Sequence, residues 1–187
     1  MRSKDIVSPR EKILSVAGAL FFKEGFRAVG VDRLISESDV AKATFYKHFP
    51  SKDELITAWL DRADHAMAAW LDKAVIGSGD PIRALFEAVM AFARKPDCLG
   101  CTFQGTALEY PALDHPSHVI AQASKKRVLA RLEDLAVEAE AARPRALAEQ
   151  LYLLIEGAWA SSRMFGREAP VLHLAEAARV LVRAARQ

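Results

Sequence analysis

Apolar residues recur at helical spacing along almost the whole chain. Between Ser8 and Gly25, for example, they follow the three- and four-residue steps that place side chains on one helix face: Ile13, Val16, Ala17, Leu20 and Phe21. Charged residues interrupt every apolar run before it reaches membrane-spanning length, and no run alternates with the period of a strand. The pattern predicts an all-α protein with about nine helices.

Capping and turn residues divide this pattern into segments. Ser8-Pro9 and Asp80-Pro81 each combine a capping side chain with a first-turn proline, and Ser51 to Glu54 forms a capping box. Glycines and prolines mark most of the ends. The predicted helices are residues 9–24, 31–37, 40–49, 52–76, 81–94, 102–110, 117–142 and 144–165, with a last helix ending near Arg186.

The lengths of these helices predict two parts. Three short helices lie in residues 1–50, which we expect to form a head with a helix-turn-helix. Residues 51–187 hold longer helices with wide apolar surfaces, which predict a larger helical body.

The segment from Val31 to Leu55 carries the clearest functional signal. Ser38-Asp39 separates two short helices, and the exposed side of the second has cations, hydrogen-bond donors and an aromatic ring, but no carboxylate. A short helix with such a face, supported by another short helix, is typical of a reader of the DNA major groove. The residues on this side are Lys42, Thr44, Tyr46, Lys47 and His48.

The same segment resembles the DNA-binding end of the TetR family of bacterial repressors. The likeness is strongest over Thr44-Phe45-Tyr46-Lys47-His48-Phe49-Pro50-Ser51-Lys52-Asp53-Glu54-Leu55, and residues 11–26 look like the first helix of the family. The sequence departs from the family at Ser38-Asp39, where Ala-Gly is usual, at Ala41, where Ser is frequent, and at Ala43, where Gly is common. We expect Asp39 to supply the missing helix cap.

The resemblance implies that residues 30–52 bind double-stranded operator DNA. Thr44, Tyr46 and His48 resemble phosphate contacts of the family, and Lys52 lies in the first turn of a helix, where a phosphate is favoured. Lys42 and Lys47 are long enough to reach guanine or phosphate, and Ala43 could meet a thymine methyl group. The predicted DNA-binding residues are Gly30, Arg33, Lys42, Ala43, Thr44, Tyr46, Lys47, His48 and Lys52.

For residues 51–187, the resemblance implies an effector-binding and dimerisation domain. One head buries little surface on DNA, so we expect a homodimer through the last two helices, binding a palindromic operator. The effector is expected to be a small, mostly apolar or aromatic molecule whose binding releases the DNA. A constitutive DNA-binding regulator without a ligand is the alternative. The predicted ligand-binding residues are Met67, Trp70, Phe86, Met90, Phe103, Gln104, Tyr110 and Trp159.

Cys98 and Cys101 leave three interpretations open. They can be small packed residues at a turn, or a thiol switch, because a helix N-terminus lowers the pKa of a thiol. They can also form a metal site with His115 and His118, although this histidine spacing is short and Pro116 intervenes. We expect no metal and no cofactor, and we keep a thiol-redox-sensing repressor as a second hypothesis.

Composition and charge narrow the function classes. The 187 residues are 51% hydrophobic and 27% charged, which indicates a folded protein. The net charge of +2 comes from residues 1–55, the part expected to bind DNA. There is no phosphate-binding loop, dinucleotide fingerprint or nucleophile elbow, so we expect no catalytic residues and no enzyme activity. We also expect no membrane partner, and a cytoplasmic location, because the N-terminal residues lack an apolar signal core.

Overall fold

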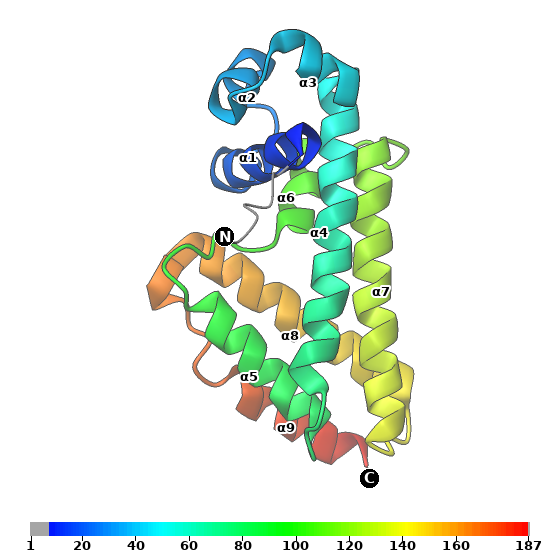
Figure 1. Ribbon diagram of the computed structural model, residues 1–187. Helices are drawn as coiled ribbons and strands as arrows, with labels where there is room; N and C mark the ends of the chain where they lie inside the picture. Colours follow the sequence, from blue (N-terminus) through cyan, green and yellow to red (C-terminus); the bar gives the residue numbers. More distant parts are fainter. Residues whose placement is uncertain (1–7, 187) are drawn as a thin grey trace, which may run out of the picture. The chain divides into compact units, whose positions relative to one another are not determined.

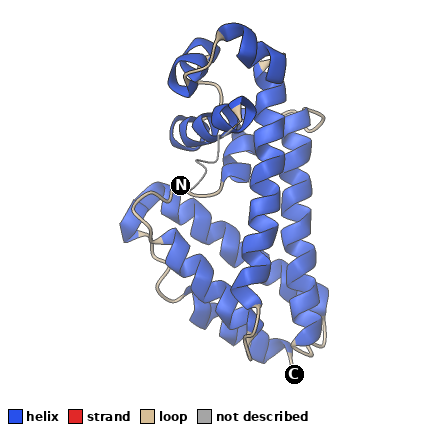
Figure 2. Cartoon of the chain, in the orientation of Figure 1, coloured by secondary structure: helices blue, strands red, loops and turns tan. Residues whose placement is uncertain are grey.

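The computed structural model describes residues 8–186, and this part of the chain contains helices and no strand (Figures 1 and 2). The prediction of an all-α protein is confirmed. The helices are α1 (Pro9–Glu24), α2 (Val31–Ser38), α3 (Lys42–His48), α4 (Lys52–Val75), α5 (Pro81–Ala93), α6 (Thr102–Glu109), α7 (Pro116–Glu138), α8 (Pro144–Phe165) and α9 (Leu174–Ala185), with a 3₁₀ turn η1 (Gly166–Glu168) after α8.

The chain packs as two compact units. Unit 1 consists of residues up to Ala63 together with 105–121, and unit 2 consists of residues 64–104 together with 122–187. Helices α4, α6 and α7 therefore each contribute residues to both units. The functional division predicted at residue 50 stays a prediction.

Unit 1 is organised around an aromatic cluster of Phe21, Phe26 and Trp59. The ring of Phe26 lies 5.1 Å from Phe21 and 5.8 Å from Trp59, between ring centroids. Gly18 of α1 lies against the same indole: a Cβ at this position would come within 2.2 Å of Trp59 Nε1. Only a residue without a side chain allows α1 to approach α4 this closely.

Unit 2 is held together by the packing of α5, α8 and α9, with α7 and the second half of α4 completing the core. Its largest fully buried side chains include Phe86, Leu132, Leu135 and Leu147. These residues come from helices widely separated in sequence, so their apolar faces can be buried only in the folded unit.

Most predicted helix ends agree with the structure, but two differ. The recognition helix α3 begins at Lys42 rather than Val40, because Asp39 adopts a left-handed conformation with φ of 49° and ends α2. The predicted cap by Asp39 is wrong: Ala41 occupies the cap position of α3 and makes no side-chain cap bond. Helix α7 ends at Glu138 rather than near Ala142, and Glu140 follows with φ of 57°.

Within residues 8–186, no helix is long and apolar enough to cross a membrane.

Candidate functional site

The pair α2 and α3 has the form of a helix-turn-helix. Leu34 of α2 and Phe45 of α3 are fully buried, and Phe49 closes the same core. The turn is fixed by Ser38, whose hydroxyl donates to the Leu34 carbonyl oxygen at 2.5 Å, and by the left-handed Asp39. Burial of Phe45 sets the rotation of α3 and so decides which side chains face outward.

The outward side of α3 carries the residues predicted to contact DNA. Lys42, Ala43, Tyr46 and Lys47 are exposed, whereas Thr44 and His48 are half-buried. The Tyr46 ring is 42% exposed and stands edge-on to Phe45, with centroids 5.5 Å apart. Packing against Phe45 restricts this ring while leaving its hydroxyl group outside the core.

Two carboxylates near this face are paired with lysines. Asp39 lies 2.9 Å from the Nζ of Lys12 on α1, and Asp32 lies 3.7 Å from the Nζ of Lys42. Both pairs are largely exposed to solvent, so each contributes little to stability. Each lysine therefore offsets a negative charge beside the outward side of α3.

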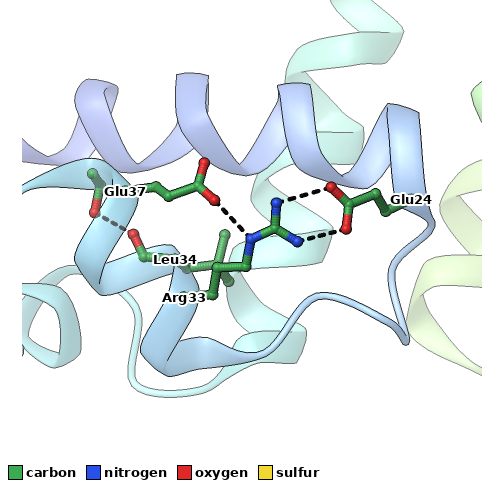
Figure 3. A network of polar contacts seen from close by, with 5 residues as sticks. Glu24, Arg33, Leu34 and Glu37 are labelled. Carbon is green, nitrogen blue, oxygen red and sulfur yellow. Dashed lines mark hydrogen bonds and ion pairs between the residues drawn. The ribbon is translucent and has the colours of Figure 1, made fainter.

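Arg33 is held by two carboxylates within unit 1 (Figure 3). Its Nη1 and Nη2 donate to Glu24 at 2.5 and 2.9 Å, and its Nε donates to Glu37 at 2.6 Å. The hydrogen bonds to Glu24 and Glu37 raise the pKa of Arg33, and the bond from Arg33 lowers the pKa of Glu24. Arg33 therefore links α1 to α2, although the sequence predicts it as a DNA contact.

Glu109, at the end of α6, holds the segment between α1 and α2. Its carboxylate accepts hydrogen bonds from the backbone amides of Phe26 at 3.0 Å and Arg27 at 2.8 Å. Gly25 precedes these amides with φ of 89°, and a Cβ there would lie 2.7 Å from Glu109 Oε1.

Lys52, at the start of α4, contacts the same segment. Its Nζ donates to the Arg27 carbonyl oxygen at 3.5 Å. Burial lowers the pKa of Lys52, and the nearby carboxylates of Asp53 and Glu109 act in the opposite direction.

Comparison with known proteins decides which family this architecture represents. The sequence model of the family described as "Bacterial regulatory proteins, tetR family" matches residues 13–59. The crystal structure of SCO4454, a TetR-family transcriptional regulator from Streptomyces coelicolor, superposes with a TM-score of 0.91 and 30% identity, covering 96% of both chains. The chain belongs to the TetR family. It is accordingly a DNA-binding transcriptional regulator and not an enzyme.

Sequence relatives within the TetR family agree over a shorter stretch. The transcriptional repressor KstR of Mycolicibacterium smegmatis is 34% identical over 76 residues, which are 41% of this chain and 37% of KstR. The regulator LmrA of Bacillus subtilis is 30% identical over 94 residues, which are 50% of this chain and 48% of LmrA. The chain thus spans less than half the length of these curated relatives.

Unit 2 of this TetR-family protein contains a small, mostly apolar cavity. Its volume is about 20 Å³, and four of the predicted ligand-binding residues line it: Met67, Trp70, Phe103 and Trp159. The other four do not. Phe86 is fully buried in the core, Met90 packs against that core, Gln104 bonds to Glu156, and Tyr110 belongs to unit 1.

A charged pair lies at the wall of this cavity. Lys125 Nζ is 2.5 Å from Glu156 Oε1, with both side chains 18% exposed, and Gln104 Nε2 donates to Glu156 Oε2 at 2.9 Å. Burial acts to lower the pKa of Lys125, but Cys101 and Glu156 outweigh it, so the pKa is raised. The pair of Lys125 and Glu156 was not predicted, because residues 31 positions apart give no local signal of a pair in the sequence.

The two cysteines are free, and they belong to different environments. Cys98 is buried in the core of unit 2, whereas Cys101 is half-buried and lines the cavity.

The two histidines considered for a metal site both contact Tyr110. His118 Nδ1 lies at hydrogen-bond distance, 2.7 Å, from the Tyr110 carbonyl oxygen, and the His115 ring stacks on the Tyr110 ring with centroids 4.4 Å apart. Among residues 8–186, no group of three or more His, Cys, Asp or Glu is arranged to hold a metal ion.

Proposed function

We propose that this protein is a homodimeric repressor that binds a palindromic operator through α3 and leaves the DNA when a small effector binds in unit 2. The observation that carries the proposal is the outward side of α3, where Lys42, Tyr46 and Lys47 project from a helix fixed by buried Phe45. Cationic and hydrogen-bonding side chains on a rigid helix suit the phosphates and base edges of a major groove.

Within this proposal, the predicted residues divide into contacts and supports. Lys42, Ala43, Tyr46 and Lys47 are exposed enough to contact DNA, and the half-buried Thr44 and His48 contact it from the edge of the face.

The predicted residues outside α3 have other roles. We assign Gly30 to close approach of the backbone to DNA, because it is exposed at the start of α2. We assign Arg33 to the frame of the site, since its guanidinium is occupied by Glu24 and Glu37. Lys52 contributes charge beside the Arg27 carbonyl.

The exposed surfaces of α8 and α9 support dimerisation. On α8 the uncharged residues Leu153, Gly157, Ala160 and Met164 are exposed and follow steps of four, three and four along the helix. On α9 Val180 is exposed, with the small Ala184 one turn further on. Small residues among apolar ones let two helices approach closely, so a second copy of the chain would bury this surface.

Helix α6 offers a route from effector to DNA. Gln104, near its start, bonds to Glu156 beside the cavity, and Glu109, at its end, holds the amides of Phe26 and Arg27. An effector that displaces Gln104 would move the helix that carries Glu109. We propose that this movement changes the position of α2 and α3, so that two protomers no longer match two half-sites.

The experiment that tests this function is fluorescence anisotropy on the promoter DNA of the protein's own gene, titrated against ionic strength and small aromatic compounds. The proposal predicts salt-sensitive binding of two protomers per site, relieved by at least one compound. Specific binding that no compound relieves would instead favour the constitutive regulator.

A second candidate function is redox sensing. Cys101 is half-buried, lines the cavity of unit 2 and lies beside the Lys125 side chain. This hypothesis predicts that a mild peroxide releases the DNA from wild-type protein and not from the Cys101→Ser variant. Cys98→Ser tests whether the buried Cys98 takes part, and release that survives both substitutions would exclude the thiol switch.

A further inference from the structure

Ser124, on α7, has a buried hydroxyl group that the fold does not use. The residue is 1% exposed, and its Oγ has no hydrogen-bond partner among the described residues. A serine within a helix commonly bonds to the carbonyl oxygen four residues earlier, so an unpaired hydroxyl here is unusual. An unpaired buried polar group marks a position where a ligand can supply the missing hydrogen bond.

Ser124 lies where two hollows of unit 2 meet. It lines the cavity beside Trp70 and Trp159, and it also lines a second hollow of about 170 Å³ between α4 and α7. The two hollows share three further lining residues, all apolar: Met67, Leu71 and Val128. These three side chains therefore lie at both the cavity and the second hollow, which we call the inner cavity and the outer hollow.

Ion pairs between α4 and α7 border the outer hollow. Arg127 Nε donates to Asp64 Oδ1 at 3.3 Å. Arg131 forms an ion pair with Asp72, with Nε 3.3 Å from Oδ1, but Nε makes no hydrogen bond. Each acid is thus matched by an arginine, and Lys125 and Glu156 neutralise one another at the inner cavity. The charged side chains at both hollows form ion pairs with one another, which favours an uncharged ligand over a charged one.

We propose that a small, uncharged aromatic molecule with one hydrogen-bonding group reaches unit 2 through the hollow between α4 and α7 and anchors that group on Ser124 Oγ. Its ring would displace the Met67 and Leu71 side chains and lie toward Trp70 and Trp159. The size follows from the hollow, which is smaller than the 300–1,000 Å³ or so of pockets for drug-sized ligands. This inference rests on the proposed effector role of unit 2 and names the class of effector.

The anchor is tested with 4-ethylphenol and ethylbenzene, which differ by one hydroxyl group. Binding to the full chain without DNA is measured by calorimetry and by tryptophan fluorescence, to which Trp59 of unit 1 contributes together with Trp70 and Trp159. Wild-type protein should bind 4-ethylphenol more tightly than ethylbenzene, and Ser124→Ala should lose about fivefold in affinity for the phenol only. Ser124→Ala removes no hydrogen bond of the free protein, so its fold should be intact.

Ser117→Ala is the matched control. Ser117 is also on α7, is 1% exposed and has an unpaired Oγ, but it belongs to unit 1 and lines neither hollow. The Ser117→Ala variant should bind both compounds as the wild type does. Equal affinity of wild type and Ser124→Ala for 4-ethylphenol, or no binding of either compound, would overturn the assignment.

The access path is tested separately by Ala68→Trp. Ala68 lines only the outer hollow, so an indole there should slow association of 4-ethylphenol at least tenfold. Ala69→Trp adds the same bulk at the next position, outside the lining, and should leave the rate unchanged. Identical rates in all three proteins would refute the path. Binding that depends on Ser124 without any release of DNA would preserve this site and refute the effector role.

Discussion

The Glu109 carboxylate accepts a hydrogen bond from the backbone amide of Arg27 at 2.8 Å, across 82 positions of sequence. The neighbouring amide of Phe26 donates to the other oxygen at 3.0 Å. One side chain of α6 thus fixes the segment that leads into α2. The arrangement is specific, because Gly25 leaves room for the carboxylate and any Cβ there would meet it.

Replacing Glu109 with alanine should loosen this segment. The amides of Phe26 and Arg27 would be left without their acceptor, which should cost about 1–3 kcal/mol in the free energy of unfolding. Hydrogen-exchange measurements should show faster exchange at both amides. DNA affinity should also fall, because the segment that leads into α2 is less well fixed. Leu108→Ala, at an exposed position of the same helix, should change neither quantity. Unchanged exchange in Glu109→Ala would show that the carboxylate does not hold the segment.

Gly18→Ala should destabilise unit 1. The new methyl group would collide with the Trp59 indole, and core overpacking of this kind costs about 1–3 kcal/mol. Urea unfolding followed by tryptophan fluorescence measures the change. Gly105→Ala is the control: nothing lies within 4 Å of its Cβ position, so the better helix propensity of alanine should stabilise α6 slightly. A Gly18→Ala protein as stable as the wild type would contradict the close approach of α1 and α4.

The pair Lys125 and Glu156 should show strong coupling. Lys125→Met leaves the half-buried Glu156 without its cation and should cost about 3 kcal/mol, whereas the double variant with Glu156→Gln should recover most of the stability. A double-mutant cycle in urea measures this coupling. Additive effects of the two single changes would contradict the pairing.

The pH dependence of the same pair has a definite sign. The folded pKa of Lys125 is raised above the ordinary value of 10.5. Its stabilising contribution is therefore complete below that value and is lost as pH rises through the raised pKa. The stability difference between wild type and Lys125→Met should stay constant from neutral to mildly alkaline pH. A difference that disappears below about pH 10 would contradict the raised pKa.

Leu153→Glu should weaken dimerisation. Leu153 is 68% exposed within the stripe of α8 that we assign to the second copy, and a carboxylate there would be buried without a partner. Light scattering should show a shift from dimer to monomer, with DNA affinity falling in parallel. Val137→Glu is the control, because Val137 is also exposed and lies on α7. If Leu153→Glu stays dimeric, the interface lies elsewhere.

The features that sequence predicted best are those encoded locally. Helical periodicity and turn residues indicated the all-α fold, and the burial of Phe45 together with the exposure of Lys42, Tyr46 and Lys47 agrees with the predicted face of α3. These properties depend on residues three or four positions apart, which a sequence displays directly.

The features that sequence did not predict depend on partners far along the chain. Asp39 was expected to cap α3, but its carboxylate pairs with Lys12, 27 positions away. The ion pair of Arg33 with Glu24, nine positions away on another helix, was not predicted either, and the contact of Arg33 with DNA stays a prediction. Ser124 gave no signal at all, because whether a helical serine finds a partner is decided by the folded surroundings.

The most direct test of the proposed DNA-binding face is the salt dependence of operator binding in Lys47→Ala and Tyr46→Ala. Lys73→Ala, which removes an equal charge from an exposed position of unit 2, is the control for net charge. We predict weaker binding for both α3 variants. For Lys47→Ala the slope of the logarithm of the binding constant against the logarithm of the salt concentration should also become shallower, by about one for each phosphate that the lysine neutralises. Lys73→Ala should behave as the wild type does. Equal affinities and slopes for Lys47→Ala, Tyr46→Ala and wild type would contradict the assignment of α3 to the DNA.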